Sequence, residues 1–338
     1  MNSESPSPPK GRERVGVRGD IRRTLAEFLG LALVLAVLVV VFSLTTRHFF
    51  TATTFRTVAN QIPAAVIVAV GMTFVLIIAG IDLSVGSVLG LSGSMLGTLM
   101  ARHGWPIAPA VAACLGTGVV CGLVNGLVST RWRIPSFIVT LGMLEAARGG
   151  AYLVSDSRTQ YIGAPIEGLA NASIAGLSVP FMLAVATVIV GQVVLSRTVA
   201  GRHAIAVGAN EEGARLSGIS VMPLKVAVFA ACGMLAALAA LIDTSRLASA
   251  DPNAGSGFEL QAIAAVVIGG TSLMGGRGSV VNTFFGVLII AVLGAGLAQL
   301  GVQEPTKKLI TGCVIVIAVI LDAYRHRLHR TSPRTAQP

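Results

Sequence analysis

The sequence predicts an all-α polytopic membrane protein with about ten transmembrane helices. Three observations support this fold class. Hydrophobic residues make up 54% of the 338 residues, charged residues only 12%, and the mean hydropathy is +0.80, whereas a soluble globular chain carries about 25% charged residues. Almost all of the interior is apolar and rich in glycine, and one interior stretch, 196–225, is polar with charges of both signs. Basic residues flank the first and last apolar runs.

These basic flanks predict the orientation of both ends of the chain. The first run is preceded by Lys10, Arg12, Arg14, Arg18, Arg22 and Arg23, and the last is followed by Arg325, Arg327, Arg330 and Arg334. Such flanks mark the cytoplasmic side of membrane spans and attract anionic lipid. The net charge of +10 therefore indicates membrane topology and not nucleic-acid binding. We expect a disordered cytoplasmic tail over 1–24, a transmembrane domain over 25–325 and a basic cytoplasmic tail over 326–338.

Apolar runs near the length of about 20 residues that a span needs predict the ten helices. They lie at 26–45, 62–80, 83–101, 107–129, 134–154, 178–196, 224–242, 260–270, 280–300 and 308–323. Ten crossings place both termini and the polar stretch in the cytoplasm and the segments 155–177 and 243–260 outside. The run 260–270 is short, so a re-entrant conformation there would change the count. Two inverted five-helix halves are one arrangement of ten spans, but the sequence shows no alignable repeat.

Small residues recur every four positions in two of the predicted spans. Gly118, Gly122 and Gly126 form one series, and Gly86, Gly90 and Ser94 form another. This spacing lets helix backbones approach closely in a membrane bundle, so it predicts tight packing.

The polar stretch predicts a short helix with its own start and stop. Asn210 is a suitable N-cap, Glu211 and Glu212 place negative charge in the first turn, and Gly218 can end the helix in a left-handed conformation. A helix of about two turns is marginal alone in water. We therefore expect it to pack against another surface, for which a separate protein is a candidate.

Few polar side chains lie near the predicted spans, and two interpretations stay open for each. Asp82, followed by Ser84, is a candidate cap for the next helix or a gating or contact residue. Glu145 and Arg148 can pair at i, i+3 or line a translocation path. Asn125 and Thr140 are candidates for the same path or for hydrogen bonds between helices.

No motif for nucleotide hydrolysis or other catalysis is found. The glycine-rich segment 269–279 has Arg277 where a P-loop needs Lys followed by Ser or Thr, and neither HExxH nor GxSxG occurs. If a membrane bundle without a nucleotide site transports a solute, its energy comes from an ion gradient or from a second protein. The predicted cytoplasmic helix favours a second protein, since its motion can open a bundle.

Three long stretches resemble the membrane permease of ribose-type ABC sugar importers, within the branched-chain amino acid and ribose permease superfamily. They are GMTFVLIIAGIDLSVGSVLGLSG (71–93), GANEEGARLSGI (208–219) and LASADPNAGSGFELQAIAAVVIGGTSLMGGRGSVVNT (247–283). The resemblance covers about 25–325 and keeps the family's order. It implies that the chain is a subunit of the bacterial inner membrane and works as a homodimer. It also implies two partner proteins: a cytoplasmic ABC ATPase that binds ATP and Mg²⁺, and an extracytoplasmic sugar-binding protein. No cofactor is implied for this chain.

The resemblance also implies where the ATPase makes contact, in a coupling loop over 197–224. The contact residues carried over are Gly208, Asn210, Glu211, Arg215, Leu216, Ser217, Gly218 and Ile219. Where the family usually has two alanines after Asn-Glu, this chain has Glu212 and Gly213, which bears on the rigidity of the contact.

We therefore expect a permease that moves a monosaccharide, such as a ribose-like sugar, by alternating access. The alternatives are an ion-coupled transporter using Asp82, Glu145 and Arg148, a permease for branched-chain amino acids or another small solute, and a membrane scaffold.

Overall fold

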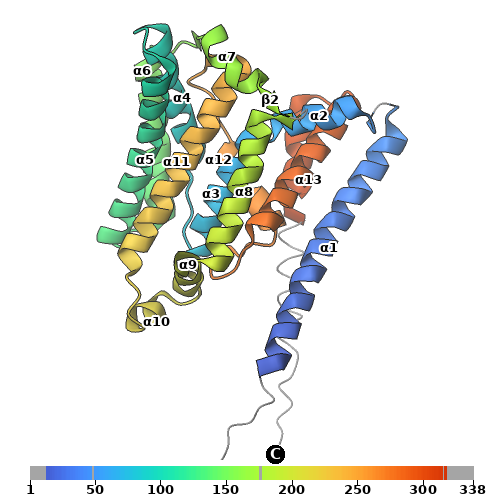
Figure 1. Cartoon of the computed structure of the whole chain (residues 1–338), viewed down its shortest axis with the longest axis vertical. Coiled ribbons are helices and arrows are strands. Elements are labelled where there is room, and N and C mark those ends of the chain that lie inside the picture. Colours follow the sequence, from blue (N-terminus) through green and yellow to red (C-terminus); the bar gives the residue numbers. More distant parts are fainter. Residues whose placement is uncertain (1–12, 48, 175–176, 315, 318–338) are drawn as a thin grey trace, which may run out of the picture.

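The computed structural model describes residues 13–47, 49–174, 177–314 and 316–317, with side chains from Phe28 onward. It forms one bundle of helices (Figure 1). The helices α9 and α10 lie at one end of the bundle and α7 lies at the other. We call these the α10 end and the α7 end. The predicted tail 326–338 lies outside the described residues.

The chain builds the bundle in three stretches. The first holds α1 (Glu13–Thr45), α2 (Ala52–Gln61), α3 (Pro63–Ile77), α4 (Val85–Ala101), α5 (Ile107–Arg131) and α6 (Ser136–Ser155). The second holds β1 (Gln160–Tyr161), α7 (Ala164–Asn171), β2 (Ser173–Ile174), β3 (Leu177–Ser178) and α8 (Val179–Arg197). The third holds α9 (Val199–Ala209), α10 (Glu211–Leu216), α11 (Val221–Leu247), β4 (Ser249–Ala250), α12 (Phe258–Ile268), α13 (Val280–Gln299) and a helix over 304–314.

The all-α membrane fold is confirmed, but the count of ten spans is not. Within the described residues six helices are long and apolar enough to cross a membrane: α1 from Phe28, α5, α6, α8, α11 and α13. A seventh candidate is the pair α2 and α3, which is bent by 48°. The predicted spans 83–101 and 260–270 correspond to the shorter helices α4 and α12. The predicted span 308–323 runs past the described residues.

The two short helices adjoin segments without helical structure, and this is the physical reason for the lower count. Residues 78–84 separate α3 from α4, and residues 269–279 separate α12 from α13. At the N-terminal boundary of the predicted transmembrane domain, α1 begins at Glu13, so residues 13–24 are helical where a disordered tail was expected. Arginine, a good helix former, occurs four times there, at Arg14, Arg18, Arg22 and Arg23, so the first helix extends beyond its apolar span toward the N-terminus.

The core is centred on α3. Thirteen of its 15 residues are buried, as expected for a helix that is hydrophobic on every side. By contrast, α1 lies at the edge, where it runs along α13 (Figure 1). Only 6% of residues 28–45 are buried. The ring of Phe42 packs over Gly296 and beside Phe49, and this small cluster attaches α1 to the rest of the bundle.

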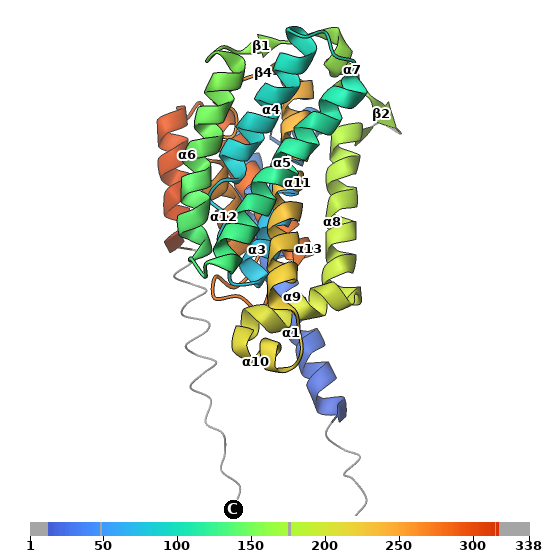
Figure 2. The same cartoon turned by 90° about the vertical axis from the view of Figure 1, so that its left-hand side faces the viewer.

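Glycine packing in α5 is confirmed, and it joins α5 to α11. A Cβ at Gly118 would overlap the Gly233 carbonyl oxygen, and a Cβ at Gly122 would overlap that of Phe229. Close approach of the two backbones therefore requires glycine here. In α4, which lies against both α5 and α6 (Figure 2), Gly86 and Gly90 instead accommodate the backbone of residues 252–255.

Candidate functional site

The polar stretch forms α9 and α10, and the predicted start and stop of α10 are confirmed. The Asn210 side chain accepts a hydrogen bond from the backbone N–H of Gly213 at 2.9 Å, so Asn210 is the N-cap. Gly218 has φ +83°. The backbone N–H groups of Gly218 and Ile219 donate to the carbonyls of Arg215 and Ala214 at 3.0 and 3.1 Å. This pair of bonds is a Schellman motif, which satisfies the last carbonyls of the helix.

One face of α10 packs against its own chain and the opposite face is open. Ala214 is buried in a cluster with Val207 and Val221, so part of the packing surface that we expected lies within this chain. Leu216 is 81% exposed. The exposed face of α10 is therefore available for contact with another surface.

Charge fixes α10 to the start of α11. Lys225 Nζ lies 2.6 Å from one carboxylate oxygen of Glu211, and Arg215 lies 3.2 Å from the other. The hydrogen bond from Lys225, together with the positive charges of Lys225 and Arg215, lowers the pKa of Glu211 below its ordinary value of 4.5. Glu211 therefore stays ionised at neutral pH and holds the two helices together.

The end of α9 makes a backbone junction with both non-helical segments. A Cβ at Gly208 would overlap the carbonyl oxygen of Ile77, the last residue of α3, and would lie 2.6 Å from the backbone nitrogen of Gly276. Gly276 N–H donates to that same Ile77 oxygen at 2.8 Å. We call Ile77, Gly208 and Gly276 the glycine junction. It couples the position of α9 and α10 to the segments 78–84 and 269–279.

The segment 78–84 runs into the bundle along α6. Ile81 N–H donates to Ser136 Oγ at 2.9 Å, and Leu83 N–H donates to Thr140 Oγ1 at 3.0 Å. Thr140 also donates to the Ile81 carbonyl at 3.2 Å. These side chains satisfy backbone groups that no helix pairs. Thr140, a candidate path residue, is completely buried and holds this segment in place.

Asp82, Ser84 and Asn125 form a buried chain of hydrogen bonds at the start of α4. Asp82 accepts from the backbone N–H of Ser84 at 2.9 Å and from its hydroxyl at 2.6 Å, and Asn125 Nδ2 donates to Ser84 Oγ at 2.9 Å. The predicted bond from a backbone N–H to Asp82 is therefore present. The ten predicted spans would place Asp82 between 62–80 and 83–101, at the cytoplasmic end of both, whereas the structure places it inside the bundle. Asp82 is 1% exposed, and Asn125 lies six residues, or about 9 Å, before the end of α5.

The start of α13 is satisfied in a related way. Ser279 is its N-cap and accepts from Asn282 N–H at 3.3 Å. From the neighbouring helix α8, Gln192 Oε1 accepts from the backbone N–H groups of Val280 and Val281 at 3.0 and 3.3 Å. Both helices that follow a non-helical segment thus begin on polar side chains supplied partly by another helix.

Glu145 and Arg148 do not pair with each other among the described residues, which corrects one of the two interpretations. Arg148 donates to the backbone carbonyls of Pro252 and Ala254, the latter at 3.0 Å. Glu145 instead lies on the exposed side of α6. The cost of a charge at membrane depth is lowered for Arg148 because carbonyl dipoles accept its hydrogen bonds.

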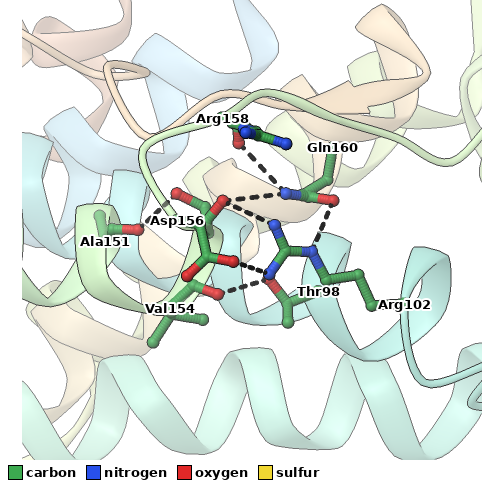
Figure 3. Close-up of polar contacts among 8 residues, drawn as sticks. Thr98, Arg102, Ala151, Val154, Asp156, Arg158 and Gln160 are labelled. Carbon is green, nitrogen blue, oxygen red and sulfur yellow. Dashed lines mark hydrogen bonds and ion pairs between the residues drawn. The ribbon is translucent and has the colours of Figure 1, made fainter.

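A polar cluster joins several elements at the α7 end of the bundle (Figure 3). Arg102, just after α4, lies 2.6 Å from Asp156 and donates to Gln160 Oε1 at 3.2 Å and to the Ser155 carbonyl at 3.1 Å. Gln160 belongs to β1, which pairs antiparallel with β4. The cluster thus connects the ends of α4 and α6 to the strand that precedes residues 251–257.

Several of these structural residues were not predicted. They are Ser136, Lys225, Arg102 and Gln160, and each makes hydrogen bonds or ion pairs that position the segments above. Each is a polar residue in or beside an apolar run, which was the available signal. In the part of the chain that the structure describes, no group of three or more His, Cys, Asp or Glu side chains could hold a metal ion.

Comparison with known proteins fits this architecture. Residues 54–319 match the family described as the branched-chain amino acid transport system permease component. The ribose import permease protein RbsC of Haemophilus influenzae is 39% identical over 295 residues, covering 86% of this chain and 91% of the relative. The chain belongs to the ribose-type ABC sugar permeases. Members of this family are transport subunits rather than enzymes, and this permease is a multi-pass protein of the bacterial inner membrane.

Two further relatives show the range of sugars in the family. The RbsC of Bacillus subtilis is 39% identical over 313 residues, covering 89% of this permease and 93% of the relative. The fructose import permease protein FrcC of Rhizobium meliloti is 36% identical over 285 residues, covering 82% and 79%. No solved structure matches the chain.

Proposed function

We propose that this permease is the membrane subunit of an ATP-driven importer that carries a monosaccharide by alternating access. A ribose-like sugar is the first candidate, because two of the similar relatives are named ribose import permeases. A fructose permease is nearly as similar, so the proposal commits to a neutral monosaccharide as the class. The observation that carries the proposal is the glycine junction, which gives α10 a rigid connection to both non-helical segments.

The α10 end is the proposed docking surface for a cytoplasmic ATPase, which binds ATP and Mg²⁺. Leu216 is 81% exposed, and Met274, next to the glycine junction in sequence, is 87% exposed. Two apolar side chains at this end, with the charged side chains of Glu212 and Arg215 beside Leu216, suit a protein partner. This assignment makes the α10 end cytoplasmic and the α7 end extracytoplasmic, in agreement with the basic flanks of the sequence.

The proposed translocation path follows the side of the bundle formed by α6, residues 251–257 and α12. This surface carries Glu145, the Arg148 hydrogen bonds to backbone carbonyls, and the exposed Asn253, Ser256 and Gln261. Polar groups at membrane depth favour a water-filled path over lipid. A second copy of the chain is proposed to cover the path, and a sugar-binding protein to deliver substrate at the α7 end.

The proposed movement follows from the way the helices are connected. When the ATPase moves α10, the Glu211–Lys225 pair and the Schellman turn carry that motion to α11. The glycine junction carries it to residues 78–84 and 269–279. Because Asp82, Ser84, Asn125 and Thr140 hold the first of these segments to α5 and α6, a rigid-body shift of α9 and α10 changes how these helices pack.

Transport by the purified parts tests this proposal. The permease is reconstituted in vesicles with a candidate ABC ATPase and a candidate sugar-binding protein, and uptake of labelled ribose and fructose is measured with and without ATP. We expect uptake that requires all three proteins and ATP. Equal uptake without the ATPase, or uptake abolished by an ionophore at constant ATP, would instead favour an ion-coupled transporter.

A further inference from the structure

A cavity at the α10 end is lined by an excess of positive charge. Its volume is about 730 Å³. The walls are the α5–α6 turn, residues 78–80 after α3, and the segment from α10 to the start of α11. Four cationic side chains and one carboxylate line it: Arg131, Arg133, Arg215, Lys225 and Glu211.

Only part of this charge is neutralised within the chain. Glu211 forms ion pairs with Lys225 at 2.6 Å and with Arg215 at 3.2 Å. Arg131 and Arg133, in contrast, make no hydrogen bond or ion pair with their side chains within the described residues. A concave surface with uncompensated positive charge concentrates anions, and two free guanidinium groups match the geometry of a phosphate.

The surroundings of the two arginines are those of a membrane interface. Trp132 lies between them in sequence and is 63% exposed. Trp and Arg at the ends of spans typically lie at the level of lipid headgroups. Exposed apolar side chains of α5 and α6 adjoin this turn, namely Leu127, Phe137 and Ile138, and Ile134 is exposed within the turn itself. Acyl chains can therefore lie along the two helices while a headgroup enters the cavity.

Arg133 ends α5 in a left-handed conformation. Its φ is +55°, and it directly follows the C-cap residue Trp132, a position where helices commonly adopt this conformation. The resulting turn places the Arg133 side chain in the wall of the cavity.

We propose that this cavity binds the phosphate headgroup of an anionic phospholipid, with Arg131 and Arg133 as its ligands. The proposal deepens the proposed function and rests on its assignment of the α10 end to the cytoplasmic leaflet. Because residues 78–80, Glu211 and Arg215 form other walls of the same cavity, a bound lipid contacts both the segment after α3 and the helix proposed to receive the ATPase. Lipid composition then affects how α10 is held.

The test measures lipid binding by the full-length permease in detergent, without the ATPase. Dioctanoyl phosphatidylglycerol is titrated while the melting temperature is followed, with dioctanoyl phosphatidylcholine as the headgroup control and inorganic phosphate as the soluble source of the same chemistry. We expect saturable stabilisation by phosphatidylglycerol alone. The variant R131Q/R133Q should bind it about tenfold or more weakly, because removing even one hydrogen bond between charged groups weakens binding by at least this factor.

The matched control is R56Q/R158Q, which removes two exposed arginines at the α7 end and should bind phosphatidylglycerol like the parent protein. The single variants R131Q and R133Q repeat the measurement if the double variant does not fold. Equal affinity in R131Q/R133Q and parent, or equal affinity for phosphatidylcholine, would overturn the proposal. If inorganic phosphate stabilised the protein as much as phosphatidylglycerol does, the cavity would bind free phosphate and the assignment to a lipid headgroup would be wrong. If the parent protein bound phosphatidylglycerol as expected but showed no ATP-driven uptake, the proposed transport function would fail and the lipid site would stand.

Discussion

The substitution Gly208→Ala tests whether the glycine junction transmits movement from α10. The added Cβ would overlap the Ile77 carbonyl oxygen and lie 2.6 Å from the Gly276 nitrogen, and both neighbours are backbone atoms. Neither can move as a flexible side chain does. Overpacking of a tight interface costs about 1–3 kcal/mol, and loss of the Gly276–Ile77 hydrogen bond adds about 1 kcal/mol. We expect a loss of stability of about 2–4 kcal/mol, localised at the α10 end.

The assay compares two quantities in the same reconstituted complex. The melting temperature of the permease reports stability, and the ratio of sugar uptake to ATP hydrolysis reports coupling. We expect G208A to lower the ratio even at temperatures where the bundle is folded. The control is Gly294→Ala in α13, where a Cβ would meet no atom of the described residues within 4 Å. The coupling ratio should stay unchanged, and the melting temperature should stay the same or rise slightly, because alanine favours a helix over glycine. Normal coupling in a folded G208A protein would refute the role of the junction.

Three further predictions concern the polar groups of the site. Arg215→Glu should leave the melting temperature nearly unchanged, because exposed ion pairs within a helix contribute about 0.3–0.5 kcal/mol to stability. The same variant should weaken the sugar uptake that depends on the ATPase. Unchanged uptake would show that α10 does not take part in coupling. Asp82→Ala leaves the Ser84 groups without their partner and should lower the free energy of unfolding by about 1–3 kcal/mol, measured by thermal denaturation; an unchanged transition would contradict a structural role. The depressed pKa of Glu211 means that its ion pair contributes stability above pH 4.5 and loses it as the pH falls through the folded-state pKa. Lys225→Gln should raise that pKa toward the ordinary value, as followed by ¹³C NMR of the labelled carboxyl group, whereas an unshifted titration would show that Lys225 is not the cause.

The features that could be predicted from the sequence are those set by local chemistry. Asn210 as a cap, Gly218 as a left-handed stop and the glycine series of α5 all depend on neighbours close in sequence or on a helical repeat, and the structure confirms them. The choice of hydrogen-bond partners over long range could not be predicted. Arg148 has a suitable partner three residues away, yet it donates to carbonyls more than a hundred residues later.

The count of ten spans is not confirmed, for a related reason. Hydropathy records how apolar a segment is but not whether the segment faces lipid or protein. The runs that became α4 and α12 are apolar because protein surrounds them, and non-helical segments beside them are tolerated where other side chains complete their hydrogen bonds. Gln192, Ser136 and Thr140 do so from other helices. No pattern local to residues 78–84 or 269–279 names those partners.

The peripheral attachment of α1 has a consequence for the time course of biosynthesis. Its contacts are with α13, as in the hydrogen bond between Thr46 and Gln299, residues 253 positions apart. At a synthesis rate of about 5–20 residues per second, roughly 10–50 seconds pass before that partner exists. During this interval α1 lacks the helix that it packs against in the finished bundle. Helix α1 is apolar on all sides, and Leu29, Leu33 and Val40 are still exposed in the finished bundle. It can therefore remain in the bilayer as a single inserted helix until α13 is made.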